Sequence, residues 1–269
     1  MDWFLAIGKV ALAVAIALPL LLWVLQERLI FFPQSLSGPQ RAALAQRFPG
    51  VREVFLQSGE QKIHAWHVPA QPGAPLVIYF GGNAEEVSWM IPEAATRVPG
   101  VAWLLVDYRG YGGSEGSPSE TTILADALQW YDYAARELKP ARISVFGRSL
   151  GSGPAVFLAS QRTISQVILA TPFDSLLEVA KRHYPYLPVR LMLRHPFDSI
   201  GRAPGIVAPL LCLAAQRDEV IPPAHARKLY DAWGGAKRWI ELEEAGHNTT
   251  DSHPLFWQNV GSFLAKPAP

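Results

Sequence analysis

The stretch Arg142-Ile-Ser-Val-Phe-Gly-Arg-Ser-Leu-Gly-Ser-Gly153 indicates the fold of this chain. Its β-branched and aromatic residues, up to Phe146, are typical of a buried strand. The small residues after Ser149 lead into an apolar segment, Ala155 to Ala159, that is typical of a helix. Between a strand and a helix, the Gly-x-Ser-x-Gly pattern predicts a serine held at a sharp turn with its hydroxyl clear of the backbone.

The residues around Ser149 suit that turn. Strained dihedral angles there leave no space for side chains at Gly147 and Gly151. The helix that follows directs N–H groups and its positive end toward any oxyanion formed nearby, so the Leu150 N–H is a candidate oxyanion donor. The pattern alone occurs by chance in roughly one chain in ten of this length. Partners elsewhere in the chain must therefore decide its meaning.

Length and composition are those of one large α/β domain with an appendage. The chain has 269 residues, of which 49% are hydrophobic, and its net charge is +1 without a run of like charges. This balance argues against nucleic acid as a partner and against a polybasic arm that binds lipid. Cys212 is the single cysteine, in an apolar setting typical of a core residue. We recognise no metal-binding cluster and no cofactor motif in the sequence, so we expect neither a metal nor a cofactor.

The N-terminal segment is long and apolar. From Trp3 to Leu25 only Lys9 is charged, and this length is sufficient to cross a hydrocarbon core. We predict that residues 1–28 form an uncleaved, single-pass transmembrane signal anchor, which places the protein at a membrane. A cleaved signal peptide fits less well because no small-x-small site follows, and a buried core helix because no polar stripe interrupts the segment. Basic residues on both sides leave the orientation open.

The remaining chain alternates apolar runs with helical segments, which predicts a mostly parallel sheet flanked by helices. We expect a linker at 29–49 and the catalytic domain at 50–269, with a β-hairpin at the edge of the sheet. The expected strands lie at 51–56, 62–68, 76–80, 101–106, 142–146, 166–171, 210–215 and 237–242. A proline-rich insertion at about 175–208 predicts a small cap over the carboxyl ends of the strands. Four residues of this cap are candidates for the wall of a substrate pocket, namely Tyr184, Leu187, Leu191 and Met192.

Gly81-Gly82-Asn83 follows the expected strand at 76–80. Two glycines allow the backbone to approach a ligand closely, and a second oxyanion donor belongs on this loop. The Asn83 N–H is our candidate, and an ordinary turn between strand and helix is the alternative.

Two further residues complete a catalytic set. Asp218 lies just past the strand at 210–215, and we prefer it to Glu219, which we expect to be solvated. His247 lies in the loop after the last strand, and we prefer it to His253, which precedes a helix. The order Ser149, Asp218, His247 is that of the α/β-hydrolases and differs from the orders of chymotrypsin and subtilisin.

These motifs together resemble the membrane-anchored α/β-hydrolase-domain serine hydrolases. The resemblance spans roughly positions 50 to 265 and rests on Gly82-Asn-Ala84, Asp107-Tyr-Arg-Gly-Tyr-Gly112, Gly147-Arg-Ser-Leu-Gly-Ser-Gly153, Thr171-Pro-Phe-Asp-Ser175, Asp218-Glu-Val-Ile-Pro222 and Gly246-His-Asn248. It implies esterase, lipase or thioesterase activity on acyl groups. One departure is Gly81, where relatives usually have histidine.

We therefore expect a membrane-anchored serine hydrolase that cleaves ester or thioester bonds of small-molecule acyl or lipid substrates through Ser149, Asp218 and His247. Peptidase action in the same fold and a catalytically silent scaffold are the alternatives. A haloalkane- or epoxide-type hydrolase is excluded because it needs an acidic nucleophile where Ser149 stands.

Overall fold

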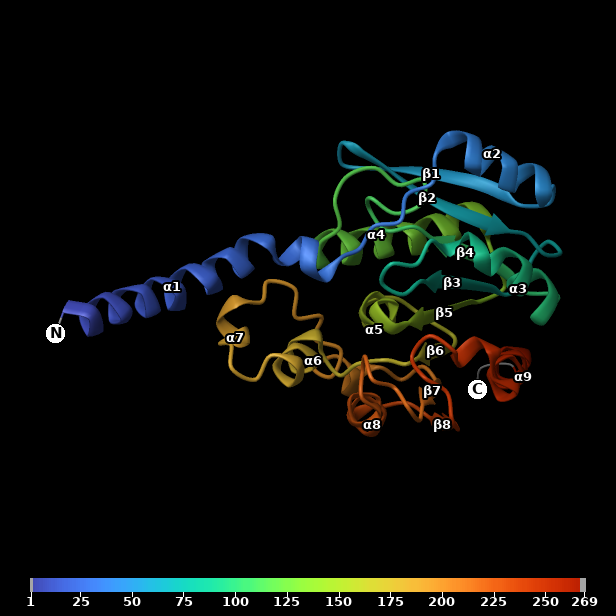
Figure 1. Cartoon of the computed structure of the whole chain (residues 1–269). Coiled ribbons are helices and arrows are strands. Elements are labelled where there is room, and N and C mark those ends of the chain that lie inside the picture. Colours follow the sequence, from blue (N-terminus) through green and yellow to red (C-terminus); the bar gives the residue numbers. More distant parts are fainter. Residues whose placement is uncertain (1, 267–269) are drawn as a thin grey trace.

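A single sheet of eight strands forms the centre of the computed structural model, which describes residues 2–266 (Figure 1). The spatial order is β1-β2-β4-β3-β5-β6-β7-β8. The strands are β1 (Arg52–Ser58), β2 (Gln61–Val68), β3 (Leu76–Phe80), β4 (Ala102–Val106), β5 (Ile143–Arg148), β6 (Val167–Ala170), β7 (Leu210–Ala215) and β8 (Lys237–Leu242). β1 and β2 form an antiparallel hairpin at one edge, and β3 to β8 are parallel. The predicted mostly parallel sheet is confirmed.

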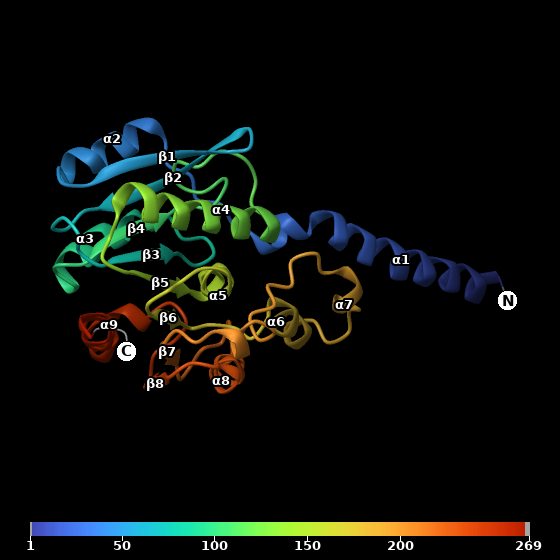
Figure 2. The same cartoon turned by 180° about the vertical axis from the view of Figure 1, so that it is seen from behind.

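Helices cover both faces of the sheet because its inner strands are apolar on both sides. α4 (Glu120–Tyr133), α5 (Ser152–Gln161) and α8 (Pro223–Ala232) pack on one face, which Figure 2 shows. α3 (Met90–Arg97) and α9 (Pro254–Ala265) pack on the other. β3 illustrates the division, since Ile78 belongs to the first core and Tyr79 to the second. Each fully buried side chain of this size contributes about 1.5–3 kcal/mol.

Shorter elements complete the chain. α2 (Gly38–Arg47) lies over the hairpin and begins with a capping box formed by Ser37 and Gln40. Single 3₁₀ turns lie at Val87–Trp89, Ser149–Gly151, Ala203–Gly205 and Thr250–Ser252, and a π turn at Ala134–Leu138 extends α4.

α1 (Asp2–Ile30) extends away from the rest of the molecule (Figure 1). Many of its large apolar side chains are exposed: Trp3, Phe4, Ile7, Leu18, Leu20, Leu21, Trp23, Val24 and Leu29. In the part of the chain that the structure describes, no helix has both the length and the apolarity needed to cross a membrane. The expected transmembrane anchor at residues 1–28 is therefore not confirmed.

The segment predicted as a cap contains α6 (Leu176–His183) and α7 (Val189–Met192), and it contacts the end of α1. The Gln26 side chain donates to the Met192 carbonyl at 3.1 Å and accepts from the Arg194 N–H at 2.8 Å. Phe31, which is 2% exposed, packs edge-on against Phe197. These contacts fix the last turns of α1 against the cap.

Candidate active site

Ser149 lies at the junction of β5 and α5, with a φ angle of +50°. This left-handed conformation is strained for a residue with a side chain. A Cβ added to Gly147 would lie 2.3 Å from the Gly151 carbonyl oxygen, and one added to Gly151 would lie 2.0 Å from the Phe80 carbonyl oxygen. Glycine is therefore required at position 147 so that the turn can close on itself, and at position 151 so that the turn can pack against β3.

Three side chains form one hydrogen-bonded chain. His247 Nε2 lies 2.8 Å from Ser149 Oγ, and His247 Nδ1 lies 2.7 Å from Asp218 Oδ2. Asp218 Oδ1 accepts the N–H groups of Val220 at 3.0 Å and Ile221 at 2.7 Å. The two amides orient the buried carboxylate so that its other oxygen accepts the Nδ1 proton, which leaves Nε2 free to accept the serine proton.

The structure brings together the three residues that we selected from the sequence and separates them from their competitors. Glu219 is exposed, as expected of a solvated neighbour. His253 Nδ1 accepts the Leu255 N–H and so caps α9.

The side chain of Asn83 ties the loop after β3 to the end of α1. Its Nδ2 donates to the Ile30 carbonyl at 2.5 Å, and its Oδ1 accepts from the Phe32 N–H at 3.0 Å and from the Tyr111 hydroxyl at 2.8 Å. The sequence pointed to the backbone N–H of Asn83 and gave no sign of these contacts. They fix the position of the loop that carries this N–H.

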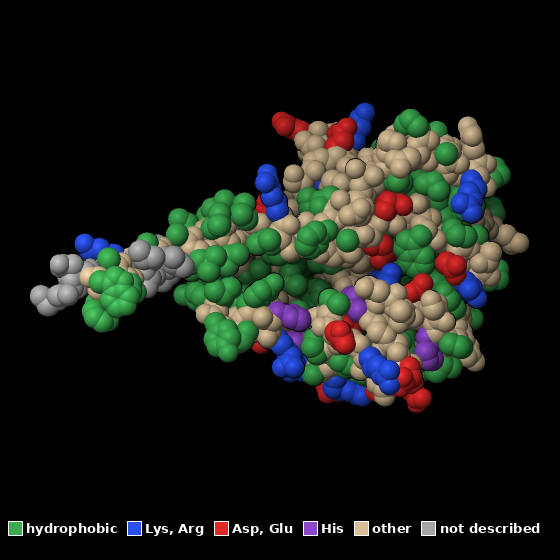
Figure 3. All heavy atoms as spheres, in the orientation of Figure 1, with side chains coloured by type: hydrophobic (Ala, Val, Ile, Leu, Met, Phe, Trp, Pro, Cys, Tyr) green, Lys and Arg blue, Asp and Glu red, His purple; other side chains and the backbone are tan. Residues whose placement is uncertain are grey.

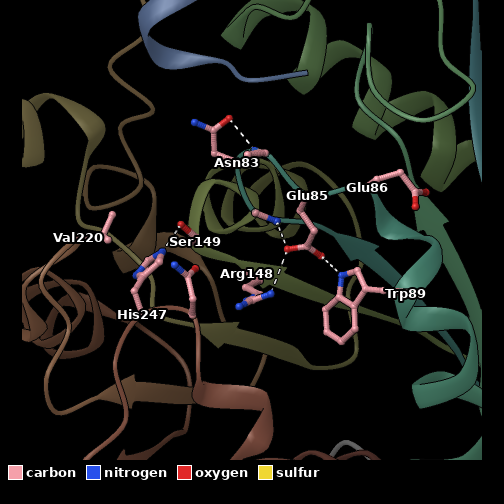
Figure 4. A pocket seen from close by; sticks show the side chains of 11 residues that line it. Asn83, Glu85, Glu86, Trp89, Arg148, Ser149, Val220 and His247 are labelled. Atoms are coloured by element: carbon pink, nitrogen blue, oxygen red, sulfur yellow. Dashed lines mark hydrogen bonds and ion pairs between the residues drawn. The ribbon is translucent and has the colours of Figure 1, made fainter. Parts of the chain in front are cut away.

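Glu85 holds the same loop through its buried carboxylate, a role that the sequence alone did not indicate. One carboxylate oxygen accepts from the Tyr79 hydroxyl at 2.6 Å and from Trp89 Nε1 at 2.9 Å. The other accepts the Gly82 N–H at 2.7 Å and pairs with Arg148 at 3.3 Å (Figure 4). Its side chain is 8% exposed. Because the Gly82 N–H is engaged, the Asn83 N–H remains the candidate donor on this loop.

Glu85 also explains the glycine at position 81. A Cβ on Gly81 would lie 2.9 Å from Val87 Cγ1 and 3.0 Å from Glu85 Oε1. The space beside Gly81 is thus occupied by the Glu85 carboxylate. Glu85 lies two residues after Asn83, and Arg148 lies directly before Ser149. This proximity to two candidate site residues is the sequence signal that could have indicated the Glu85–Arg148 ion pair.

Burial shifts the pKa of two side chains near the catalytic serine. Burial raises the pKa of Glu86, although its hydrogen bonds to Ser88 act in the opposite direction. Burial and the neighbouring Glu85 carboxylate raise the pKa of the Tyr79 hydroxyl well above its usual value. Tyr79 therefore remains a hydrogen-bond donor to Glu85 at any physiological pH.

A cavity of about 500 Å³ opens over Ser149 and His247, within the range of ligand pockets. We call it the catalytic cavity. Its lining is largely polar and consists of Gly82, Asn83, Ala84, Glu85, Glu86, Trp89, Arg148, Ser149, Val220, His247 and Asn248.

The four cap residues that we predicted for the pocket wall do not line the catalytic cavity. Tyr184, Leu187 and Met192 line a second cavity of about 420 Å³ between the cap and the end of α1, which we call the cap groove. Leu191 is 85% exposed and lies outside both linings. The prediction of a wall beside Ser149 is therefore wrong for all four residues. Leu191 lies outside even the cap groove, and the sequence did not indicate this because α7 has only four residues, too few for apolar periodicity to indicate its buried side.

Comparisons with known proteins agree with this fold. The chain is 35% identical over 251 residues to an uncharacterized protein of Mycobacterium tuberculosis, covering 91% of this chain and 88% of that protein. It is 29% identical over 284 residues to the alpha/beta hydrolase domain-containing protein WAV2 of Arabidopsis thaliana, covering 93% and 90%. It is 30% identical over 216 residues to an uncharacterized membrane protein of Saccharomyces cerevisiae, covering 76% and 75%.

Among solved structures, an esterase of Pyrococcus furiosus matches with a TM-score of 0.67 and 18% identity, covering 88% of this chain and 100% of that chain. No protein-family model matches. The sheet topology, the Arabidopsis relative and the solved esterase together indicate the α/β-hydrolase class. The chain belongs to one family with the Mycobacterium tuberculosis protein. The Arabidopsis relative carries the alpha/beta hydrolase name, and the solved esterase shares the fold.

Proposed function

We propose that this protein is a serine hydrolase that cleaves carboxylic ester or thioester bonds of acyl substrates. The observation that carries the proposal is the hydrogen-bonded chain from Ser149 through His247 to Asp218, with the serine at a strained turn facing a cavity. The esterase function of the structural neighbour is a property of that protein, and the proposal rests on the geometry of this site.

The chemistry follows from the order of the three side chains. As Ser149 Oγ attacks the carbonyl carbon, its proton passes to His247 Nε2, and Asp218 stabilises the imidazolium without taking the proton. Collapse of the tetrahedral intermediate expels an alcohol or thiol, which receives the proton from His247 and leaves an acyl-enzyme. A water molecule then reacts by the same route and releases the acid.

The Leu150 and Asn83 amides are the proposed donors to the oxyanion. One well-placed donor of this kind lowers the barrier by about 2.7–4 kcal/mol. On this proposal Glu85 and the Asn83 side chain act as positioning groups, because they hold the loop that carries the Asn83 N–H.

Hydrolysis of p-nitrophenyl butanoate tests the proposal. We expect activity in the full chain, and a loss of about 10⁴-fold or more in kcat for Ser149→Ala and for His247→Ala. Ser252→Ala serves as the matched control, since Ser252 is exposed in the turn before α9. Activity that survives in Ser149→Ala refutes the proposal. Hydrolysis of peptides but not of esters would favour the peptidase alternative, and a folded protein inactive on both would favour the scaffold.

We also propose that α1 attaches the protein to a membrane as a single-pass anchor. The exposed apolar side chains of α1 support this, and the yeast relative is named a membrane protein. Extraction of cell membranes tests it: an anchored full chain stays in the pellet after a sodium carbonate wash and is released by detergent. Release by carbonate, or recovery in the soluble fraction, would contradict the anchor.

A further inference from the structure

The cap groove has walls that suit a hydrocarbon. One wall comes from the last turns of α1, including Leu22 and Leu29, and the other from the cap, including Ala180, Leu187 and Met192. Figure 3 shows the hollow between α1 and the cap, with hydrophobic side chains on both sides. Such a surface favours an apolar occupant over water.

Gln26 contributes an amide to this lining, and that amide is already engaged. Its nitrogen donates to the carbonyl oxygens of Trp23 at 2.8 Å and Met192 at 3.1 Å, and its oxygen accepts from the Arg194 N–H at 2.8 Å. The Gln26 amide therefore needs no polar partner from a ligand in the groove.

The cap groove and the catalytic cavity are neighbours, because hydrogen bonds join residues of one lining to residues in or next to the other. Ile30 and Phe32 line the groove and bind the side chain of Asn83, which lines the catalytic cavity. From the cap, His183 Nε2 lies 2.9 Å from the carbonyl oxygen of Val220, another residue of the catalytic cavity. His183 directly precedes Tyr184, which lines the groove.

The catalytic cavity itself does not suit a long alkyl chain, since Glu85, Glu86 and Arg148 give it charged walls. A substrate with such a chain needs an apolar site next to Ser149, and the groove is the adjoining site with that character. We propose that the cap groove binds the fatty acyl chain of the ester substrate while its carbonyl lies at Ser149. This inference rests on the proposed function and names its substrate class: esters of long-chain fatty acids.

Filling the groove tests the inference. Ala180→Trp adds bulk from α6, and Met192→Trp adds it independently from α7, so that misfolding of one variant leaves the other. Leu191→Trp is the matched control, because Leu191 lies in the same cap outside the groove lining and is 85% exposed. The assay compares kcat/KM for p-nitrophenyl butanoate and p-nitrophenyl hexadecanoate in the full-length protein.

We expect both groove variants to lose about tenfold or more of kcat/KM on the long ester and less than about twofold on the short one, since only the long chain buries apolar surface there. The control should retain both activities. Equal losses on the two esters, or an unchanged long-chain activity in folded groove variants, would overturn the inference.

A binding measurement separates failure of this inference from failure of the proposed chemistry. cis-Parinaric acid, a fluorescent fatty acid, is titrated into Ser149→Ala with and without Ala180→Trp. Saturable binding that Ala180→Trp weakens by about tenfold supports the groove even if no ester is hydrolysed. Equal binding in both proteins, or none in either, refutes the groove even if Ser149 is a competent nucleophile.

Discussion

Replacing Glu85 by glutamine tests how the loop after β3 is held. Its carboxylate accepts hydrogen bonds from the Gly82 N–H, the Tyr79 hydroxyl and Trp89 Nε1, and it pairs with Arg148. An amide has the same shape, but its NH₂ group cannot accept a hydrogen bond. Whichever way the amide turns, two of these donors lose an acceptor.

The size of the effect follows from burial. The side chains of Glu85 and Arg148 are 8% and 14% exposed, so solvent replaces the lost partner poorly. Hydrogen bonds to a charged group contribute about 1.5–3 kcal/mol each, and breaking a buried ion pair costs about 3–5 kcal/mol. We expect Glu85→Gln to lower the free energy of unfolding by about 2–4 kcal/mol.

The catalytic effect should go beyond stability. If Glu85 positions the Asn83 N–H, the variant loses oxyanion stabilisation, and kcat on a short ester should fall by about 10²-fold with little change in KM. Urea unfolding and ester kinetics on the same preparation measure both quantities. The matched control is Glu93→Gln on α3, whose exposed pair with Arg97 is worth less than about 1 kcal/mol. A Glu85→Gln protein that equals wild type in both assays would refute this account of the loop.

Two other substitutions have sharp expectations. Asp218→Asn should keep the fold but favour the wrong tautomer of His247. We therefore expect kcat for ester hydrolysis to fall by about 10⁴-fold, the loss known for the same change in the serine protease triad. A loss below about tenfold would remove Asp218 from the proposed mechanism. Gly151→Ala places a Cβ 2.0 Å from the Phe80 carbonyl oxygen, so thermal unfolding should show a destabilisation of about 1–3 kcal/mol or more. An unchanged melting temperature would mean that the elbow and β3 can move apart.

Much of the fold could be predicted from the sequence because the parallel strands are buried on both faces. Val101 to Val106 and Leu210 to Ala215 are uninterrupted apolar runs, and such runs indicate inner strands without tertiary information. The three catalytic candidates could also be predicted from the sequence, because each follows a strand end and the carboxyl ends of parallel strands meet at one edge of the sheet.

The contacts that hold the loop after β3 could not be predicted from the sequence in the same way. Asn83 binds Ile30 across 53 positions of sequence, and local periodicity carries no information about which distant segment meets a loop. Glu85 looks like an ordinary charged residue at the start of a helix until the fold buries it beside Arg148. The position of the cap residues was hidden for a related reason. Their apolar character was visible, but the groove that Tyr184, Leu187 and Met192 line depends on where α1 ends.

The most direct test of the central claim, that Ser149 is an activated nucleophile, is labelling of the full-length protein with a fluorophosphonate probe followed by mass spectrometry of the modified peptide. The account predicts phosphonylation at Ser149 in wild type and none in Ser149→Ala, with strongly reduced labelling in His247→Ala, which keeps the serine but lacks its base. A folded wild-type protein that resists the probe, or one that is labelled equally well without His247, would contradict it.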